Sequence, residues 1–405
     1  MSVYDRPMAR PETGIGDVRG GKPADPFPRK GRDLRLDFFR GLSLFFIFID
    51  HIPNNFLGYF TLRSIAFSDA AEVFIFISGY TAALVYGRAM SQKGVLVASA
   101  QIYRRVWQLY VAHIFLFVIF TAEVSYTVLA VNNPMYNEEM GVGDFLNEPH
   151  VAIIKALLLQ FQPTFLDILP LYIVLLGIFP LVLVALARGP LWALIPSAAL
   201  YALTLRHGWS PPAYPADHVW FFNPFAWQFL FIIGASAGHA RISGRWPFPH
   251  APWLSQLAVS IAAVLVVINV SWAIHWVYDP FPALFEKLLY NFTTDKTNLA
   301  PFRLLNFLAL ALATVHFVRP ESRFLQWRAT RPIIICGQHS LYIFCLGILL
   351  AVLGHFVLSE FYGTLPMQIG VNLTGFAAMI GVAALLTWYK AAGSSGASAP
   401  ATPSE

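Results

Sequence analysis

The feature that most constrains this chain is a series of long apolar runs that recurs along almost its whole length. Each run has the roughly 20 residues that an α-helix needs to cross a hydrocarbon core. Charged residues make up only 12% of the 405 residues, against about a quarter in soluble domains, and the mean hydropathy is +0.58. The sequence therefore predicts an all-α, polytopic membrane protein.

Hydropathy predicts a bundle of about ten transmembrane helices. Their expected ranges are 36–57, 66–88, 105–130, 165–187, 190–206, 219–240, 252–276, 300–318, 332–357 and 366–389. A further apolar stretch, 151–161, is too short to cross and is expected to lie at the membrane interface or to re-enter.

The two ends of the chain differ in composition from the part between them. Residues 1–35 are rich in Pro, Gly and Arg and contain no apolar segment of a secretory signal, and residues 391–405 are a Gly/Ala/Ser/Pro run. Such segments cannot bury enough apolar surface to pack. We therefore expect one transmembrane domain, 36–390, between two disordered tails.

The distribution of Lys and Arg predicts the orientation of the chain. With a cytoplasmic N-terminus, twenty of the 27 basic residues lie on the cytoplasmic side, six lie outside, and Arg40 lies within the first helix. The positive-inside rule favours this arrangement, with both termini cytoplasmic. It places the longest loops, 131–164 and 277–299, outside, where they either contact a hydrophilic acceptor or are solvated connectors.

Several other classes of function lack support in the sequence. The net charge of +5 comes from basic residues scattered between apolar runs, so it does not indicate nucleic-acid binding. No metal, nucleotide or dinucleotide motif is present, and we expect no metal site and no permanently bound cofactor. Gly234-Ala235-Ser236-Ala237-Gly238 matches the serine-hydrolase pattern, but inside an apolar helix its small residues predict close helix packing.

The first predicted helix carries charges that lipid would not tolerate. Arg40 and His51 are eleven residues apart, so they share one helix face and are separated by roughly 16 Å along the axis. A guanidinium suits phosphate or carboxylate, and a neutral imidazole can take a proton from a hydroxyl. The alternative is that Arg40 snorkels and pairs with Asp37, with His51 a satisfied polar residue at the boundary.

Carboxylates near His51 are candidates to orient its imidazole. Asp69 and Glu72 begin the second predicted helix, and a hairpin would bring them to the depth of His51. A carboxylate that fixes the tautomer of a histidine is the usual arrangement for a general base. Asp50 is adjacent in sequence and therefore about 100° around the helix from His51.

The first helix and several later segments resemble a known family. The pattern Leu36-Asp37-x-x-Arg40-Gly41, with ten residues between Arg40 and His51, is similar to the Arg-x10-His motif of the acyltransferase-3 superfamily. A closer resemblance, from about Arg32 to Trp388, is to the OpgC family, whose named activity is succinylation of osmoregulated periplasmic glucans. The strings that carry it are RDLRLDFFRG, IDHIPNN, FSDAAEVFIFISGYTAALVYGR, LDILPLYIVLL and FFNPFAWQFLFIIGA.

This resemblance implies an enzyme of a bacterial inner membrane that moves an acyl group from cytoplasmic acyl-CoA, such as succinyl-CoA or acetyl-CoA, to a hydroxyl of an extracytoplasmic glucan or polysaccharide. His51 then matches the catalytic histidine, and Arg40, with Asp37 beside it, the donor-organising arginine. The later strings contribute polar or aromatic positions expected to line the substrate pocket, namely Asp167, Asn223, Trp227 and Gln228. For Asn223 the alternative is a local backbone cap before Pro224.

Further candidates follow from charge and position. Arg328 and Arg331, in a cytoplasmic arginine cluster, either set topology or hold CoA phosphates. His339 nearby is a substrate-binding candidate or an interfacial residue without a role. Outside, Lys296 and Arg303 either anchor the chain at the interface or hold the free carboxylate of a dicarboxylic acyl group.

A tetrahedral oxyanion would need hydrogen-bond donors, for which Ser78, Gln228 or a backbone amide are candidates. The partners expected are acyl-CoA, the glycan acceptor and membrane lipids, with the oligomeric state left open. A transporter or flippase, in which the buried charges gate a substrate or relay protons, is the alternative function. An inactive scaffold would leave those charges unexplained.

Overall fold

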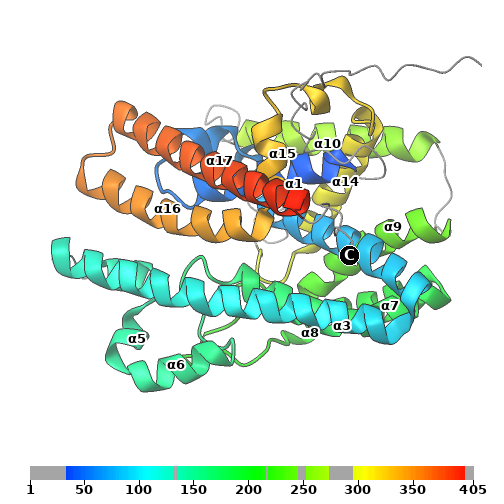
Figure 1. Ribbon diagram of the computed structural model, residues 1–405, viewed down its shortest axis with the longest axis horizontal. Coiled ribbons are helices and arrows are strands. Elements are labelled where there is room, and N and C mark those ends of the chain that lie inside the picture. The colour runs from blue at the N-terminus through cyan, green and yellow to red at the C-terminus, as the bar shows by residue number, and fades with distance from the viewer. Residues whose placement is uncertain are drawn as a thin grey trace, which may run out of the picture. The chain divides into compact units, whose positions relative to one another are not determined.

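A computed structural model describes residues 33–131, 133, 135–215, 218–244, 252–272 and 295–396 of the chain (Figure 1). Within these ranges every regular element is helical and no strand is present, so the all-α prediction is confirmed. The helices are α1 (Leu34–Asp50), α2 (Leu62–Ile65), α3 (Ala70–Val131), α4 (Met135–Glu139), α5 (Gly143–Asn147), α6 (Pro149–Leu157), α7 (Ile168–Arg188), α8 (Pro190–His207), α9 (Pro224–Ser243), α10 (Pro252–Trp272), α14 (Pro301–Phe317), α15 (Arg331–Gln338), α16 (Ser340–Glu360) and α17 (Leu365–Gly396), with 3-10 turns η1 (Phe56–Phe60) and η3 (Arg323–Gln326).

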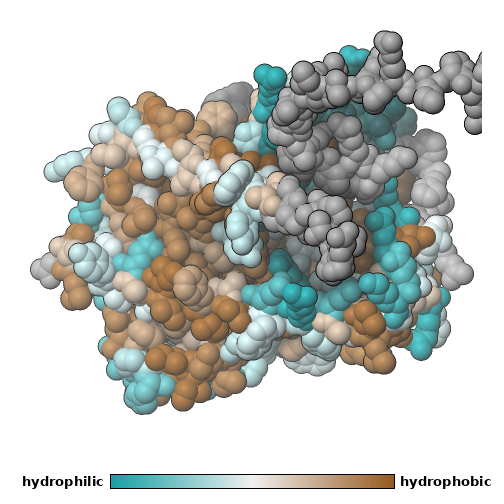
Figure 2. Space-filling view, in the orientation of Figure 1, coloured by the Kyte–Doolittle hydropathy of each residue, from teal (hydrophilic) through white to brown (hydrophobic). Residues whose placement is uncertain are grey.

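Five of the described helices are long and apolar enough to cross a membrane. By length and composition they are Ala70–Val131, Ile168–Arg188, Trp253–Val270, Ser340–Glu360 and Leu365–Ala392. Figure 2 shows a broad hydrophobic surface over α16, α17 and part of α3, of a kind that soluble monomers do not expose. The chain is a membrane protein, whereas the number of ten spans is not confirmed and stays a prediction.

The longest helix, α3, is broken at Gly94. This residue has φ +83° and ψ +169°, a conformation that glycine adopts without strain. Tyr86 before the break and Arg105 after it line the same cavity, so the two halves lie side by side, and Figure 1 shows the chain reversing between them. The helices predicted at 66–88 and 105–130 are therefore joined by a helical hairpin with a single-residue break.

The first half of α3 packs against α9 through glycines. A Cβ atom added at Gly234 would overlap the carbonyl oxygen of Phe76, one added at Gly238 would overlap that of Tyr80, and one added at Gly79 would overlap that of Phe231. Because no side chain separates the two backbones, the helices approach closely. The hydrolase-like pattern at 234–238 is thus a helix-packing motif, as the sequence predicted.

The predicted ends of the transmembrane domain fall close to described helix ends. Within the predicted N-terminal tail, residues 1–32 lie outside the described residues, and α1 begins at Leu34. At the other end, α17 continues to Gly396, and residues 397–405 lie outside the described residues. Of the predicted loop 277–299, residues 277–294 lie outside them as well. The predicted loop 131–164 contains α4, α5 and α6.

The contact between α3 and α9 predicts a large difference between two glycine-to-valine substitutions. Gly238→Val should destabilise the protein by about 1–3 kcal/mol or more, because its side chain would collide with the Tyr80 backbone. Gly177→Val on α7 is the control, since an added Cβ there meets no atom within 4 Å. Thermal unfolding in detergent would measure both, and equal melting temperatures would contradict the packing.

Candidate active site

His51 lies directly after the last residue of α1 and is held by the helix that precedes it. Its Nδ1 hydrogen-bonds to the carbonyl oxygen of Ile47, one turn back. Because a carbonyl oxygen only accepts, Nδ1 carries the proton and Nε2 is the nitrogen with the free lone pair. The ring packs edge-on against Phe165, with their centroids 4.3 Å apart. The imidazole is therefore set in the tautomer that a general base needs.

The carboxylates predicted to orient His51 have other partners. Glu72 accepts two hydrogen bonds from Arg303, from Nε at 2.8 Å and from Nη2 at 2.6 Å. Asp50 accepts a hydrogen bond from the Thr61 hydroxyl at 2.7 Å. The prediction that Glu72 or Asp50 fixes the tautomer is corrected: the carbonyl of Ile47, which also accepts the backbone amide of His51 at 3.1 Å, does so.

Asp69 and Glu72 form a capping box at the start of α3. Asp69 accepts from the Ala71 amide at 2.8 Å, and the second oxygen of Glu72 accepts from the Asp69 amide at 2.8 Å. The sequence Asp-Ala-Ala-Glu before an apolar run is the signature of this motif, so the sequence contained the signal. The box fixes both carboxylates where the chain enters the helix.

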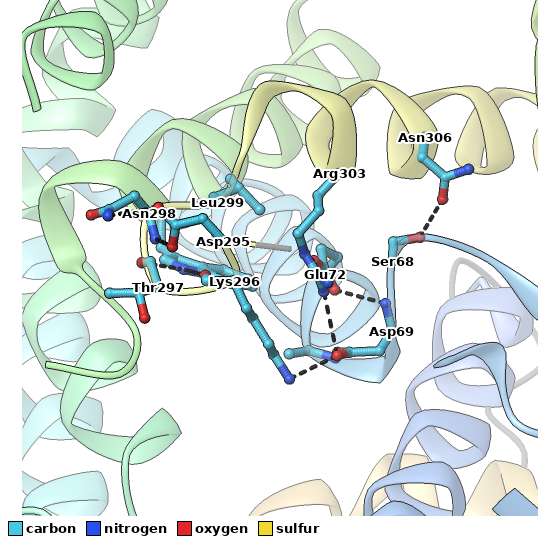
Figure 3. Close-up of polar contacts among 12 residues, drawn as sticks. Ser68, Asp69, Glu72, Asp295, Lys296, Thr297, Asn298, Leu299, Arg303 and Asn306 are labelled. Carbon is cyan, nitrogen blue, oxygen red and sulfur yellow. Dashed lines mark hydrogen bonds and ion pairs between the residues drawn. The ribbon is translucent and has the colours of Figure 1, made fainter. Parts of the chain in front are cut away.

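Two cations from a distant part of the chain complete this cluster (Figure 3). Lys296 contacts Asp69 at 2.7 Å, and Arg303, in the first turn of α14, contacts Asp69 at 3.3 Å and Glu72 at 2.6 Å. The Glu72 side chain is 0% exposed. The four charges neutralise one another, which is the condition for keeping such groups away from water.

Lys296 is the cation of this cluster whose charge acts on the other candidate residues, as the charge of Asp69 also does. Its ammonium group interacts electrostatically with His51 and Asp167, and lies 5.5 Å and 5.3 Å from the ring centroids of Phe221 and Phe222. Its side chain is 28% exposed, against 12% for Arg303. Lys296 is thus within reach of a substrate, whereas Arg303 is enclosed by its two carboxylates.

Three residues predicted to line the pocket have internal partners instead, and two of them hold the turn that carries Lys296. Trp227 Nε1 donates to the carbonyl oxygens of Lys296 at 3.1 Å and Thr297 at 3.2 Å. Asn223 caps α9 by accepting from the Phe225 amide, and its Nδ2 donates to Asn298 Oδ1 at 2.9 Å.

Gln228, the third of these residues, pairs with Ser197 at 2.6 Å and 2.9 Å. Asn223, Trp227 and Gln228 are all buried. For these three residues the pocket-lining interpretation is corrected in favour of positioning, because each polar group already has an internal partner. The oxyanion interpretation is corrected in the same way for Gln228. The alternative of a local backbone cap is confirmed for Asn223.

Arg40 lies in a cavity of ≈ 170 Å³ between α1, both halves of α3, α7 and α16. Its Nη2 donates to Thr81 Oγ1 at 2.7 Å. Arg105 and Ser78 line the same cavity, and no carboxylate is among its lining residues. Two guanidinium groups in its wall make the cavity suited to an anion.

The helices that line this cavity also carry residues of the His51 side. Phe74 lies two residues beyond Glu72 on α3, and Leu169 lies two residues beyond Asp167. Two residues advance a helix by roughly 3 Å and turn it by about 200°, so Phe74 and Glu72 lie at neighbouring heights on different sides of α3. The cavity and the ion cluster therefore share α3.

Other predicted donor-side residues lie elsewhere. Asp37 is buried, whereas Arg328 and Arg331 are exposed and do not line the cavity. His339 separates α15 from α16, directly before the cavity residue Ser340. Arg105 is one of the twenty basic residues that the charge distribution assigns to the cytoplasmic side, and Thr81 is not among the predicted site residues. Arg105 reaches the cavity of Arg40 through the reversal of α3 at Gly94, which hydropathy does not reveal.

The buried ion cluster predicts a strong effect of removing one charge. Arg303→Met should destabilise the protein by about 3–5 kcal/mol, because Glu72 would remain buried without its partner. The double variant Arg303→Met/Glu72→Met should recover most of the loss. Thermal unfolding of both in detergent is the measurement, and equal losses would contradict mutual neutralisation.

The comparisons with known proteins bear on the whole of this arrangement. A family model described as OpgC protein matches residues 32–391, which include α1, the ion cluster and the cavity. A search of curated proteins and a search of solved structures each gave no match. Since the matched range covers most of the chain, the protein belongs to the OpgC family.

Proposed function

We propose that the protein is a membrane-embedded O-acyltransferase that moves an acyl group, such as succinyl, from acyl-CoA to a hydroxyl of a glucan or related polysaccharide. OpgC family membership suggests a transferase of the glucan succinyltransferase type. The observation that carries the proposal is the cavity lined by Arg40 and Arg105, in a bundle where α1 carries Arg40 and leads directly into His51. The arginines suit the anionic groups of CoA, and the histidine suits a hydroxyl acceptor.

The reaction at His51 follows from its tautomer. Nε2 takes the proton of the acceptor hydroxyl while the hydroxyl oxygen attacks the thioester carbonyl carbon. The tetrahedral intermediate then expels the CoA sulfur, which receives the proton from the imidazolium. The Ile47 carbonyl holds the other ring nitrogen throughout, so the imidazole keeps its orientation.

Lys296 is the group proposed to bind the free carboxylate of the acyl group on the His51 side. It shares Asp69 with Arg303, remains partly exposed, and is near enough to His51 to interact with it electrostatically. An ammonium placed there attracts the free carboxylate of a dicarboxylic acyl group. Arg303 has a structural role, since its Nε and Nη2 groups already donate hydrogen bonds to Glu72 and Asp69.

The proposed orientation places donor and acceptor on opposite sides of a bacterial inner membrane. The excess of Lys and Arg in the predicted cytoplasmic segments supports cytoplasmic termini, which puts Arg40 on the cytoplasmic side and His51 toward the periplasm. Acyl-CoA would then enter from the cytoplasm, and the glucan would meet the thioester from outside.

His51→Ala should lower acyl transfer by about 10²- to 10⁴-fold, the usual contribution of a positioned general base. The control is His316→Ala, at an exposed position on α14. Thiol release from succinyl-CoA by protein in nanodiscs, with and without glucan, is the measurement. Near-parental turnover by a folded His51→Ala variant would contradict the proposal that His51 is the general base. A rapid-quench search for acyl-histidine would distinguish direct transfer from a covalent route.

Arg40→Ala and Arg105→Ala should each weaken acyl-CoA binding by about tenfold or more, since a hydrogen bond to a charged group contributes about 1.5–3 kcal/mol. Lysine at either position should lose less, because it keeps the charge without the planar fork. Arg104→Ala is the matched control, since Arg104 is the exposed neighbour of Arg105 and does not line the cavity.

Calorimetry with purified variants measures this binding. If Arg105→Ala binds acyl-CoA like the parent and Arg40→Ala does not, the donor site contains Arg40 but not Arg105. If Arg40→Ala also binds like the parent, or the parent binds no acyl-CoA, the donor site fails and the transporter alternative gains support.

A further inference from the structure

A second cavity lies away from the candidate active site, between the second half of α3 and the short helices α5 and α6. Its volume is ≈ 400 Å³. Among the described residues, its lining is apolar except for two hydroxyl groups, those of Thr121 and Ser125, and contains no charged side chain. The apolar wall includes Phe117, Val118, Ala122, Phe145 and Ile153.

The rim of this cavity belongs to the exposed hydrophobic surface of the protein. Val118 on α3 is 59% exposed and Ile153 on α6 is 45% exposed. On a membrane-spanning helix such side chains face acyl chains, so the medium that reaches the opening is lipid. Water is a poor occupant of the whole cavity, because each molecule needs two to four polar partners and the described lining of this ≈ 400 Å³ space offers two hydroxyl groups in all.

The hydroxyl of Thr121 marks where a ligand would be recognised. Thr121 is 4% exposed, and its Oγ1 has no hydrogen-bond partner among the described residues. Elsewhere the threonines of these helices donate to the carbonyl four residues back, as Thr127 and Thr204 do at 2.9 Å and 2.8 Å. A buried hydroxyl without a partner is unfavourable, so Thr121 requires an acceptor inside the cavity.

We propose that this cavity binds one acyl chain of a membrane phospholipid, with the Thr121 hydroxyl donating to the ester carbonyl of that chain. Thr121 lies sixteen residues beyond Arg105, where the predicted span 105–130 begins on the cytoplasmic side. At about 1.5 Å per residue the hydroxyl is roughly 24 Å into a hydrocarbon core of about 30 Å, and so close to the far boundary, where ester groups join the core. An uncharged, chain-shaped ligand with one acceptor at its polar end matches both the apolar wall and the unpartnered hydroxyl of Thr121.

The occupied cavity would brace the segment that contacts His51. Phe117 packs against Phe145 and Phe161, with ring centroids 5.7 Å and 6.0 Å apart. Phe161 lies four residues before Phe165, whose ring packs against His51. The bound chain thus supports one wall of the histidine site, and this step alone rests on the proposed function.

The test uses the full-length protein in nanodiscs with a trace of phosphatidylcholine that carries a diazirine on one acyl chain. After irradiation, mass spectrometry locates the label. Lipid of the surrounding bilayer should label Phe115, which is 66% exposed, whereas only a chain inside the cavity can reach Phe117, which is 4% exposed. We expect label on both residues in the parent.

Two variants and one control make the test specific. Ala122→Trp fills the cavity from its exposed side and should reduce Phe117 labelling at least about tenfold, since tryptophan removes the space. Thr121→Val keeps the shape and should reduce it about three- to tenfold, the loss expected for one hydrogen bond. Val111→Trp, on the same face of α3 but outside the cavity, should leave labelling unchanged.

The outcomes separate this proposal from the proposed function. Absence of Phe117 labelling in the parent, or equal labelling in parent and Ala122→Trp, would overturn the lipid site even if the protein transfers acyl groups. Labelling that Ala122→Trp abolishes would support the site even if no acyl transfer is found. In an active protein, a fall in turnover of Ala122→Trp but not of Val111→Trp supports the bracing of His51, and equal turnover overturns that step.

Discussion

The structure depends on keeping charged groups out of contact with lipid. Glu72 is completely buried at the start of α3, and it is tolerated because Arg303 donates two hydrogen bonds to it. Asp69 joins the same cluster and adds Lys296. These four residues tie the beginning of α3 to α14 and to the turn before it, so the position of Lys296 near His51 follows from charge neutralisation.

Packing supplies the precision that the ion cluster alone would lack. The indole of Trp227 holds the Lys296 and Thr297 carbonyls, and Asn223 holds Asn298 while capping α9. Helix α9 is in turn fixed to α3 by glycines that allow the two backbones to touch. Lys296, the cation proposed to bind the acyl group, is therefore held from two helices. Asp69 at the start of α3 pairs with its ammonium group, and Trp227 and the cap residue Asn223 of α9 bond to the turn that contains it.

The proposed chemistry is divided along the first helix. Arg40 lies within α1 and lines the first cavity, whereas His51 lies directly after the last residue of that helix. In the proposed reaction the donor would be bound by its anionic part near Arg40 and would present its thioester to His51. The aromatic contacts of the second cavity lead to Phe165 and so to the histidine ring.

The sequence by itself determined the all-α membrane class, the shared face of Arg40 and His51, the packing function of Gly234 and Gly238, and the family, because hydropathy, helical periodicity and ordered motifs are local properties of the chain. It did not determine the partners of Glu72, Trp227 or Gln228. Glu72 and Arg303 are 231 residues apart, and Arg40 and Thr81 are 41 apart. Only the tertiary structure decided these pairings, since a carboxylate or an indole can satisfy its hydrogen bonds with any suitable group that packing brings within reach.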